Sequence, residues 1–400
     1  MSNKISDRRA IRLIVSNTLV RAGRLVFQLF LNIFIWKQTD GDLEMLAVFN
    51  LIYLTVHTLS FVSFAPFIKA GYRQIFHVIW LIGYIATYMS IVYLWPESID
   101  YIFWIAASIG LFNGMYWITY HNSYFYVTTF TNRWNYEWIK KSLSITNGII
   151  VPSLIGWIIT WNYLWFWYEM AFILWSVFML WALFIWTVKI DGVDRGDFEL
   201  LKFWKVFFSH KDIFRSLYTH SFTGFSFSNT VLEVIIPVML FSYIWNELDL
   251  GFLISLFSIV SIIWAYIFWR FVDYSSYPKA ILLSGSAYCI ALVWFIVMAD
   301  LRYMILFAAV INFVLVFFSI PQKVISDNVL HTLENYNKYR VEYLVIRELF
   351  LSIWWLSTFT ILYFIGDLWF AGIHYLFAAM VIFTFISTLL LYTVDIKKIK

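Results

Sequence analysis

Long runs of apolar residues, separated by short polar segments, recur along the whole chain. A helix needs about 20 apolar residues to cross a bilayer, because each residue advances the helix by about 1.5 Å. Twelve runs reach that length, in two groups of six, so the pattern predicts an all-α membrane protein with twelve transmembrane helices. The predicted spans are Ile11–Trp36, Leu43–Ile68, Ile75–Trp95, Tyr101–Val127, Ser142–Trp161, Tyr163–Val188, Phe214–Trp245, Leu250–Val272, Ala280–Met298, Tyr303–Ile325, Tyr343–Ile365 and Leu368–Val394.

The basic residues predict how these spans are oriented. Cytoplasmic segments of membrane proteins collect Lys and Arg. With the N-terminus inside, nearly all of the 28 basic residues fall in predicted cytoplasmic segments. We therefore expect a multi-pass protein of the plasma membrane with both termini in the cytoplasm and no cleaved signal peptide. The expected division is an N-terminal half (1–189), a cytoplasmic linker (190–213) and a C-terminal half (214–400).

Composition excludes several classes of function. The chain is 62% hydrophobic and only 13% charged, whereas soluble domains contain about 25% charged residues. A net charge of +4 is too small to indicate nucleic-acid binding, and the single cysteine, Cys289, excludes an internal disulfide or a thiolate metal site. The expected partners are the lipid bilayer and a small-molecule solute, with no cofactor, no metal and no obligate protein partner.

Polar residues follow one face of the first predicted span. Asn17, Arg21, Arg24, Gln28 and Asn32 are spaced by three or four residues, which places them on one side of a helix. Ionisable residues at membrane depth usually face a water-filled cavity or each other. The seventh span, the counterpart of the first in the other group of six, has a similar stripe formed by Thr219, Thr223, Ser226, Thr230 and Glu233.

The remaining ionisable residues of the spans have simpler expected roles. His57, His121, His220 and His374 are scattered, without the spacing of a metal site, so we expect packing or interfacial hydrogen bonding. Arg347 and Glu348 fall near the start of the eleventh span, where snorkelling toward the membrane surface is the ordinary role.

A short motif repeats after the fourth and tenth spans. The pattern R-x-x-Y-x-x-I-[KR] begins at Arg133 and again at Arg340, and this offset agrees with two repeats of six helices. The chain also resembles the major facilitator superfamily, whose signature GxxxDRxGRR follows the second and eighth helices. Its later copy is similar to the segment that begins at Trp269 and includes Arg270 and Asp273, and the earlier copy retains Lys69, Gly71 and Arg73.

The resemblance implies a fold of two pseudo-symmetric six-helix bundles around a central cavity. In that family the first, fourth, seventh and tenth helices line the cavity, and the signature loops latch the halves together. A latching, or gating, role is thus implied for Arg270 and Asp273. The expected substrate-binding residues are Arg21, Arg24, Gln28, Asn113, Tyr116, Tyr120, Thr230, Glu233 and Asn312.

These features predict a secondary active transporter that moves a small solute by alternating access. Two guanidiniums at membrane depth favour an anion, because Arg binds carboxylates and phosphates in a bidentate manner. Glu233 could instead form a structural ion pair with Arg21 or Arg24, or carry a coupling proton. The alternatives to transport are a scaffold or sensor with a transporter fold and a membrane-embedded enzyme, but we expect no enzyme because no catalytic motif is present.

The ratio of 22 Trp to 15 Gly is unusual, because Trp is normally the rarer residue. Replacing Trp134, Trp138, Trp157 and Trp269 by Gly makes the surrounding segments more typical of the family. We therefore hypothesise that several Trp, including Trp264, are encoded by UGA codons that the source organism reads as Gly; the alternative is a genuinely Trp-rich protein. UGG codons in the gene would exclude the hypothesis.

Overall fold

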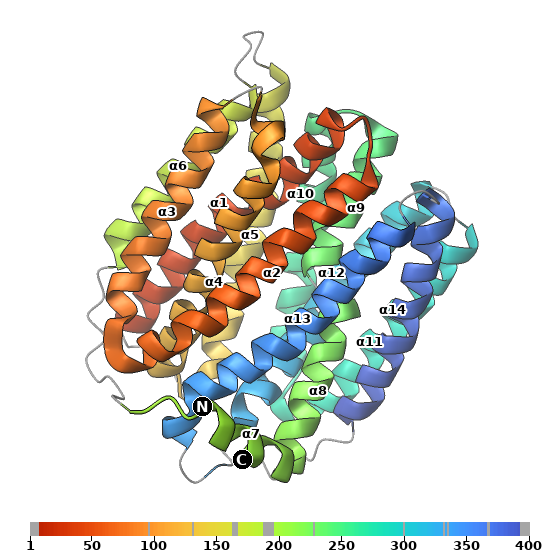
Figure 1. The fold of residues 1–400 in the computed structure, drawn as a ribbon. Helices are drawn as coiled ribbons and strands as arrows, with labels where there is room; N and C mark the ends of the chain where they lie inside the picture. The colour runs from red at the N-terminus through yellow and green to blue at the C-terminus, as the bar shows by residue number, and fades with distance from the viewer. Residues whose placement is uncertain are drawn as a thin grey trace.

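The computed structural model of the chain is built from helices (Figure 1). It describes residues 8–94, 97–129, 132–161, 167–186, 196–226, 229–298, 301–330, 333, 336–365 and 369–392. The α-helices are α1 (Arg8–Gln38), α2 (Leu43–Phe67), α3 (Arg73–Tyr93), α4 (Ile102–Val127), α5 (Arg133–Trp161), α6 (Trp167–Trp186), α7 (Leu200–Ser209), α8 (Lys211–Ser226), α9 (Asn229–Ile244), α10 (Glu247–Phe271), α11 (Tyr277–Met298), α12 (Leu301–Val329), α13 (Arg340–Ile365) and α14 (Trp369–Tyr392). The short helices are η1 (Ile68–Tyr72), η2 (Glu97–Tyr101), η3 (Tyr274–Ser276) and η5 (Tyr336–Tyr339).

This architecture confirms the predicted all-α membrane fold. Within the described ranges, nine helical segments are long and apolar enough to cross a membrane, and one of them, Leu43–Tyr93, contains both α2 and α3. Two shorter apolar helices, Met170–Ala182 and Val234–Ile244, fall in the sixth and seventh predicted spans. The seventh predicted span contains α8 and α9, and residues 227–228 between them lie outside the described ranges. A helix satisfies its own backbone hydrogen bonds, as a lipid environment requires.

The helices form two halves that meet along two long seams. In the N-terminal half α1 packs against α5 and α6, and α2 against α4; in the C-terminal half α11 packs against α12 and α14, and α8 against α13 and α14. The seams between the halves are α5 against α10 and α2 against α13, and Figure 1 shows the second pair running side by side. The domain boundaries stay a prediction, since residues 187–195 lie outside the described ranges.

Equivalent helices of the two halves begin in the same way, which supports the internal repeat. At the start of α2, the side chain of Asp42 accepts hydrogen bonds from the backbone N–H groups of the second and third following residues, at 2.8 and 3.1 Å. At the start of α10, Asn246 accepts the same two bonds at 2.9 and 3.1 Å. Such caps satisfy N–H groups that a helix leaves free and contribute about 1 kcal/mol each.

The two ends of the bundle differ in what lies there. The ends of the described chain and α7 gather at one end, which we call the linker end (Figure 1). At this end α2 turns into α3 through η1, where Gly71 has φ 104°. Only glycine adopts that backbone conformation readily. The other end of the bundle, where α1 ends and α10 begins, is called the opposite end below.

Candidate functional site

Part of the polar face of α1 lies against α4. The guanidinium carbon of Arg24 lies 5.0 Å from the centre of the Trp117 ring, and Asn17 Nδ2 donates a hydrogen bond to the hydroxyl of Tyr116. Arg21 and Arg24 are both half-buried, so their charges are partly accessible. The α1–α4 face therefore combines two cations with aromatic rings inside the N-terminal half.

The two predicted tyrosines of α4 are buried in this aromatic layer. The rings of Tyr116 and Tyr120 are stacked with their centroids 5.8 Å apart, and Trp117 stacks on His121 at 5.1 Å. The Tyr120 hydroxyl lies 3.5 Å from that of Tyr136 on α5. Tyr120 thus connects the α1–α4 face to the residues of α5 at the linker end.

The two predicted asparagines are engaged in contacts between helices. Asn113 is buried and donates to the Tyr53 hydroxyl at 2.7 Å and to His57 Nδ1 at 2.9 Å, which ties α4 to α2. Asn312 is half-buried, and its Oδ1 accepts a hydrogen bond from Ser261 Oγ at 2.8 Å, which ties α12 to α10. Their substrate-binding role stays a prediction.

Much of the predicted stripe on the seventh span lies outside the described side chains. This applies to Thr223, Ser226, Thr230 and Glu233, and also to Gln28 on α1. Thr219 is described: it is buried, and its hydroxyl donates to the backbone oxygen of Arg215 at 2.8 Å.

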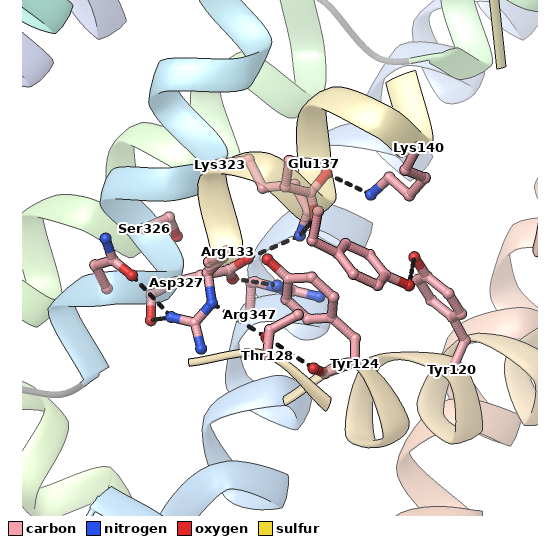
Figure 2. Close-up of polar contacts among 12 residues, drawn as sticks. Tyr120, Tyr124, Thr128, Arg133, Glu137, Lys140, Lys323, Ser326, Asp327 and Arg347 are labelled. Carbon is pink, nitrogen blue, oxygen red and sulfur yellow. Dashed lines mark hydrogen bonds and ion pairs between the residues drawn. The ribbon is translucent and has the colours of Figure 1, made fainter. Parts of the chain in front are cut away.

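At the linker end, a buried network of charges joins the two halves (Figure 2). Arg133, the first residue of α5, donates to the backbone oxygen of Asp327 at 3.0 Å and to Asn328 Oδ1 at 2.8 Å, both on α12. The Asp327 carboxylate in turn pairs with Lys323 at 2.8 Å and with Arg347 of α13 at 3.1 Å. Arg133 and Asp327 are completely buried, so these contacts form in a dry environment where unpaired charges are costly.

A second part of this network continues along α5. Glu137 forms an ion pair with Lys140 and lies 3.7 Å from the ammonium of Lys323, which belongs to the other half. The Lys323 ammonium also lies 4.7 Å from the ring of Tyr124, and Figure 2 shows Tyr124 and Tyr120 beside these charges. We call the set Arg133, Glu137, Lys323, Asp327, Asn328 and Arg347 the linker-end network.

The signature loops contribute unequally to the contact between the halves. Lys69, in the earlier copy, is buried and bonds both to the Glu342 carboxylate and, at 2.9 Å, to the backbone oxygen of Lys338. Arg270 and Asp273, in the later copy, are exposed, and within the described ranges the structure records no ion pair for either. Among the described residues, the latching contact thus comes from the earlier copy.

The linker helix is attached to the same place. The backbone N–H of Glu199, just before α7, donates to the Glu342 carboxylate at 2.9 Å. The Glu199 carboxylate bonds to Lys202 at 2.6 Å and Lys338 at 2.9 Å, and these bonds lower the pKa of Glu199 to about 2. Glu342 of α13 therefore joins η1 and the start of α7.

Sequence reasoning missed the linker-end network, although one signal was present. The repeated motif contains Arg133 and, in its second copy, Arg347. The interpretation of Arg347 and Glu348 as snorkelling residues is wrong, because both side chains are only 3% exposed and both have partners inside the protein. The partner Asp327 gave no signal, because pairing across helices is invisible in a single sequence.

The opposite end is closed mainly by close backbone packing. A Cβ added to Gly156 of α5 would lie 2.5 Å from the backbone oxygen of Glu247, and one added to Gly251 of α10 would lie 2.4 Å from that of Pro152. One ion pair accompanies this packing, between Lys37 and Glu247 at 2.8 Å. Small residues allow such close approach of membrane helices.

Solved transporters have the same arrangement of helices. The structure matches a bacterial homologue of the iron transporter ferroportin, in an outward-facing state with soaked iron, with a TM-score of 0.68 at 14% identity, covering 96% of this chain and 98% of that one. The human organic anion transporter MFSD10 matches with a TM-score of 0.67 at 13% identity, covering 96% and 99%. The chain has the major facilitator fold.

Comparison of sequences adds relatives but no assigned activity. The uncharacterised protein YqgE of Bacillus subtilis is 25% identical over 324 residues, which is 81% of this chain and 74% of that protein. A protein encoded next to sodM in Geobacillus stearothermophilus is 26% identical over 131 residues, or 33% of this chain and 61% of that protein. No family model matches the chain.

Within this major facilitator fold, two of the unusual tryptophans, Trp134 and Trp138, contact α10 across the α5–α10 seam. Trp134 lies against Phe268 with ring centroids 5.5 Å apart, and Trp138 lies against Trp269 at 5.2 Å. Trp157 is 43% exposed, and Trp264 contacts α12 through a phenylalanine. Glycine at these positions would remove the ring contacts from the seam. The codon hypothesis itself stays a prediction about the gene.

Proposed function

We propose that the chain is a secondary active transporter that carries a small anionic solute and has no catalytic activity. The single observation that supports an anionic solute is the α1–α4 face. There, two half-buried guanidiniums lie beside aromatic rings, in the half that the fold arranges around a central pathway. Arg21 and Arg24 would bind a carboxylate or phosphate of the solute, and Tyr116 and Tyr120 would shape the site around it.

The same face argues against a metal ion as the solute. One similar structure is a homologue of an iron transporter, whereas MFSD10 is an organic anion transporter, so the fold alone leaves both classes open. Within the described residues, no group of three or more His, Cys, Asp or Glu side chains is close enough to hold a metal ion. Two guanidiniums at the site would also repel a cation.

We propose that the linker-end network is the gate of this transporter. In the alternating-access scheme, halves 1–189 and 214–400 tilt relative to each other while the linker 190–213 keeps them connected. The positive charges at the linker end support a cytoplasmic location for that end in the plasma membrane. The contacts of Arg133 with α12 hold the gate closed, so a solute bound at Arg21 and Arg24 could not pass through the linker end in this state.

A flux assay with purified protein in liposomes tests the proposal. Radiolabelled phosphate, monocarboxylates and dicarboxylates serve as anion probes, and Fe²⁺ and Mn²⁺ serve as cation probes. Hydrogen bonds to charged groups contribute about 1.5–3 kcal/mol, so Arg24→Gln should reduce uptake of the transported anion by about 10- to 100-fold at low concentration. Arg302→Gln, at an exposed residue of α12, is the matched control and should leave uptake unchanged.

Three results would contradict the proposal. Uptake of Fe²⁺ or Mn²⁺ without any anion uptake would replace the anion by a metal cation. Equal uptake by the Arg24→Gln variant and the parent would remove Arg24 from the site. No flux of any probe, together with a protein partner that co-purifies, would favour a scaffold or sensor that retains the fold.

A further inference from the structure

A buried histidine and a buried glutamate face each other across the α2–α13 seam. His57 Nε2 on α2 lies 2.8 Å from Glu348 Oε1 on α13, and the two side chains are 2% and 4% exposed. Beside this pair, Thr58, the residue after His57, donates from Oγ1 to Oγ of Ser352, which lies one turn after Glu348, at 2.7 Å. The pair therefore connects the N-terminal half to the C-terminal half at a place that must separate when the halves tilt apart at the linker end.

The hydrogen bonds around His57 fit one tautomer of a neutral ring. Nδ1 accepts from Asn113 Nδ2 at 2.9 Å, so the proton of a neutral ring is on Nε2 and is donated to Glu348. Asn113 Nδ2 also donates to the hydroxyl of Tyr53 at 2.7 Å. These contacts form a continuous chain, Tyr53–Asn113–His57–Glu348, that begins on α2 and α4 and ends on α13.

Few other titratable groups can influence this pair. From α2 the structure places Tyr53 in the chain, from α4 it places the neutral amide of Asn113, and from α13 it places Trp355, whose ring lies 6.1 Å from that of His57. Arg347, the neighbour of Glu348, is paired with Asp327 of α12. In the described part of the chain, neither His57 nor Glu348 has a recorded contact with a second charged side chain.

We propose that His57 and Glu348 form the proton-coupling site of this transporter, which binds one proton when the halves are closed at the α2–α13 seam and releases it when they separate. This inference rests on the proposed transport function and names its coupling ion. The only step is a proton transfer: the proton leaves the His57–Glu348 pair and passes to water, and no other bond forms or breaks.

The physical reason is the charge of the buried pair. A neutral imidazole beside a carboxylate has a net charge of −1, and burying an uncompensated charge is costly. One added proton, on Glu348 or on the imidazole, makes the closed pair neutral. When the seam opens, water hydrates the carboxylate and the proton is released, since an exposed Glu is ionised near neutral pH. Closure and proton uptake are therefore linked.

Linkage gives the direction of the pH dependence. The closed seam binds more protons than the open seam, so low pH favours closure, and the ratio of open to closed molecules rises with pH by up to about tenfold per pH unit. The rise is confined to the pH range in which the open seam is deprotonated and the closed seam still holds its proton.

Spin-label distances measure this equilibrium without any solute. Labels are attached to Tyr72→Cys in η1 and Tyr392→Cys at the end of α14, both exposed in the parent, in a chain that also carries Cys289→Ser. In liposomes from about pH 5 to pH 9, the population with a long distance should rise steeply for the parent pair. Glu348→Gln keeps a similar shape but cannot ionise, so its long-distance population should no longer rise with pH.

A matched variant separates titration from simple loss of packing. Glu342→Gln also removes a buried carboxylate of α13, the partner of Lys69, and should raise the long-distance population at every pH while keeping the pH dependence. A parent population that does not change with pH, or a Glu348→Gln variant that keeps the parent's pH dependence, would overturn the inference. Because no solute is present, these results are independent of whether the anion-flux assay succeeds.

Discussion

The two ends of the molecule are closed by different interactions. At the linker end, the contact between the halves depends on a few buried charged side chains, above all Arg133, which reaches α12 from the first turn of α5. At the opposite end, the contact is spread over backbone atoms that meet at Gly156 and Gly251, with one partly exposed ion pair.

This difference indicates which substitutions each end can tolerate. Charged groups are strong partners in a dry site but are also well hydrated when the site opens, so a charged gate can open and close with a modest change in free energy. Close backbone packing has no such alternative partner in water, and it is sensitive to added volume instead of to lost charge. The linker end should therefore respond to charge removal and the opposite end to bulk.

Arg133→Gln should have the largest effect. It removes two charged hydrogen bonds between the halves, each contributing about 1.5–3 kcal/mol, so the open form of the linker end should increase by about 100-fold or more. The measurement is the rate of thiol labelling at Ser326→Cys, which is buried beside Asp327, in a Cys289→Ser chain.

The control variant for this prediction changes Arg270, the arginine for which the signature motif implies a latching role. Arg270→Gln removes an exposed arginine for which the described part of the chain records no ion pair, and it should leave the labelling rate of Ser326→Cys within about twofold of the parent. Faster labelling in Arg270→Gln than in Arg133→Gln would assign the gate to the later signature loop and would reverse the comparison.

Gly251→Ala should have the next largest effect. The added methyl group would lie 2.4 Å from the backbone oxygen of Pro152, which forces α5 and α10 apart and costs about 1–3 kcal/mol. We expect a lower Tm of the detergent-solubilised protein. Gly196→Ala is the matched control, because its new methyl would have its nearest neighbour at 3.7 Å; an equal Tm for the two variants would contradict close packing at this seam.

Lys37→Gln should have the smallest effect. The Lys37 side chain is 38% exposed, and exposed ion pairs contribute about 0–1 kcal/mol that salt largely screens. The Tm should fall slightly at low ionic strength and not at all in high salt. A loss as large as that of Gly251→Ala would mean that charge, not packing, closes the opposite end.

Much of the fold could be predicted from the sequence, because hydropathy and charge reflect the membrane directly. The twelve apolar runs correspond to the helices, and the seventh of them contains α8 and α9. The polar stripe of α1 and its association with α4 were also predictable, because periodicity places Asn17, Arg21 and Arg24 on one face.

The closing contacts could not be predicted in the same way. Whether a charged residue lies at the surface or in a seam depends on its partner, and partners such as Arg133 and Asp327 lie on helices far apart in the sequence. For the same reason His57 and Glu348 looked like unrelated residues, one assigned to packing and one to the membrane surface. Only the packing of α2 against α13 shows that they form a pair.

Spin-label distances at both ends of one protein test the central claim most directly, that Arg133 holds a gate at the linker end. Labels at Tyr72→Cys and Tyr392→Cys report the linker end, and labels at Tyr93→Cys and Met298→Cys report the opposite end. In Arg133→Gln, in a Cys289→Ser chain, the linker-end distance should lengthen while the opposite-end distance does not. An unchanged linker-end distance, or equal lengthening at both ends, would contradict the account.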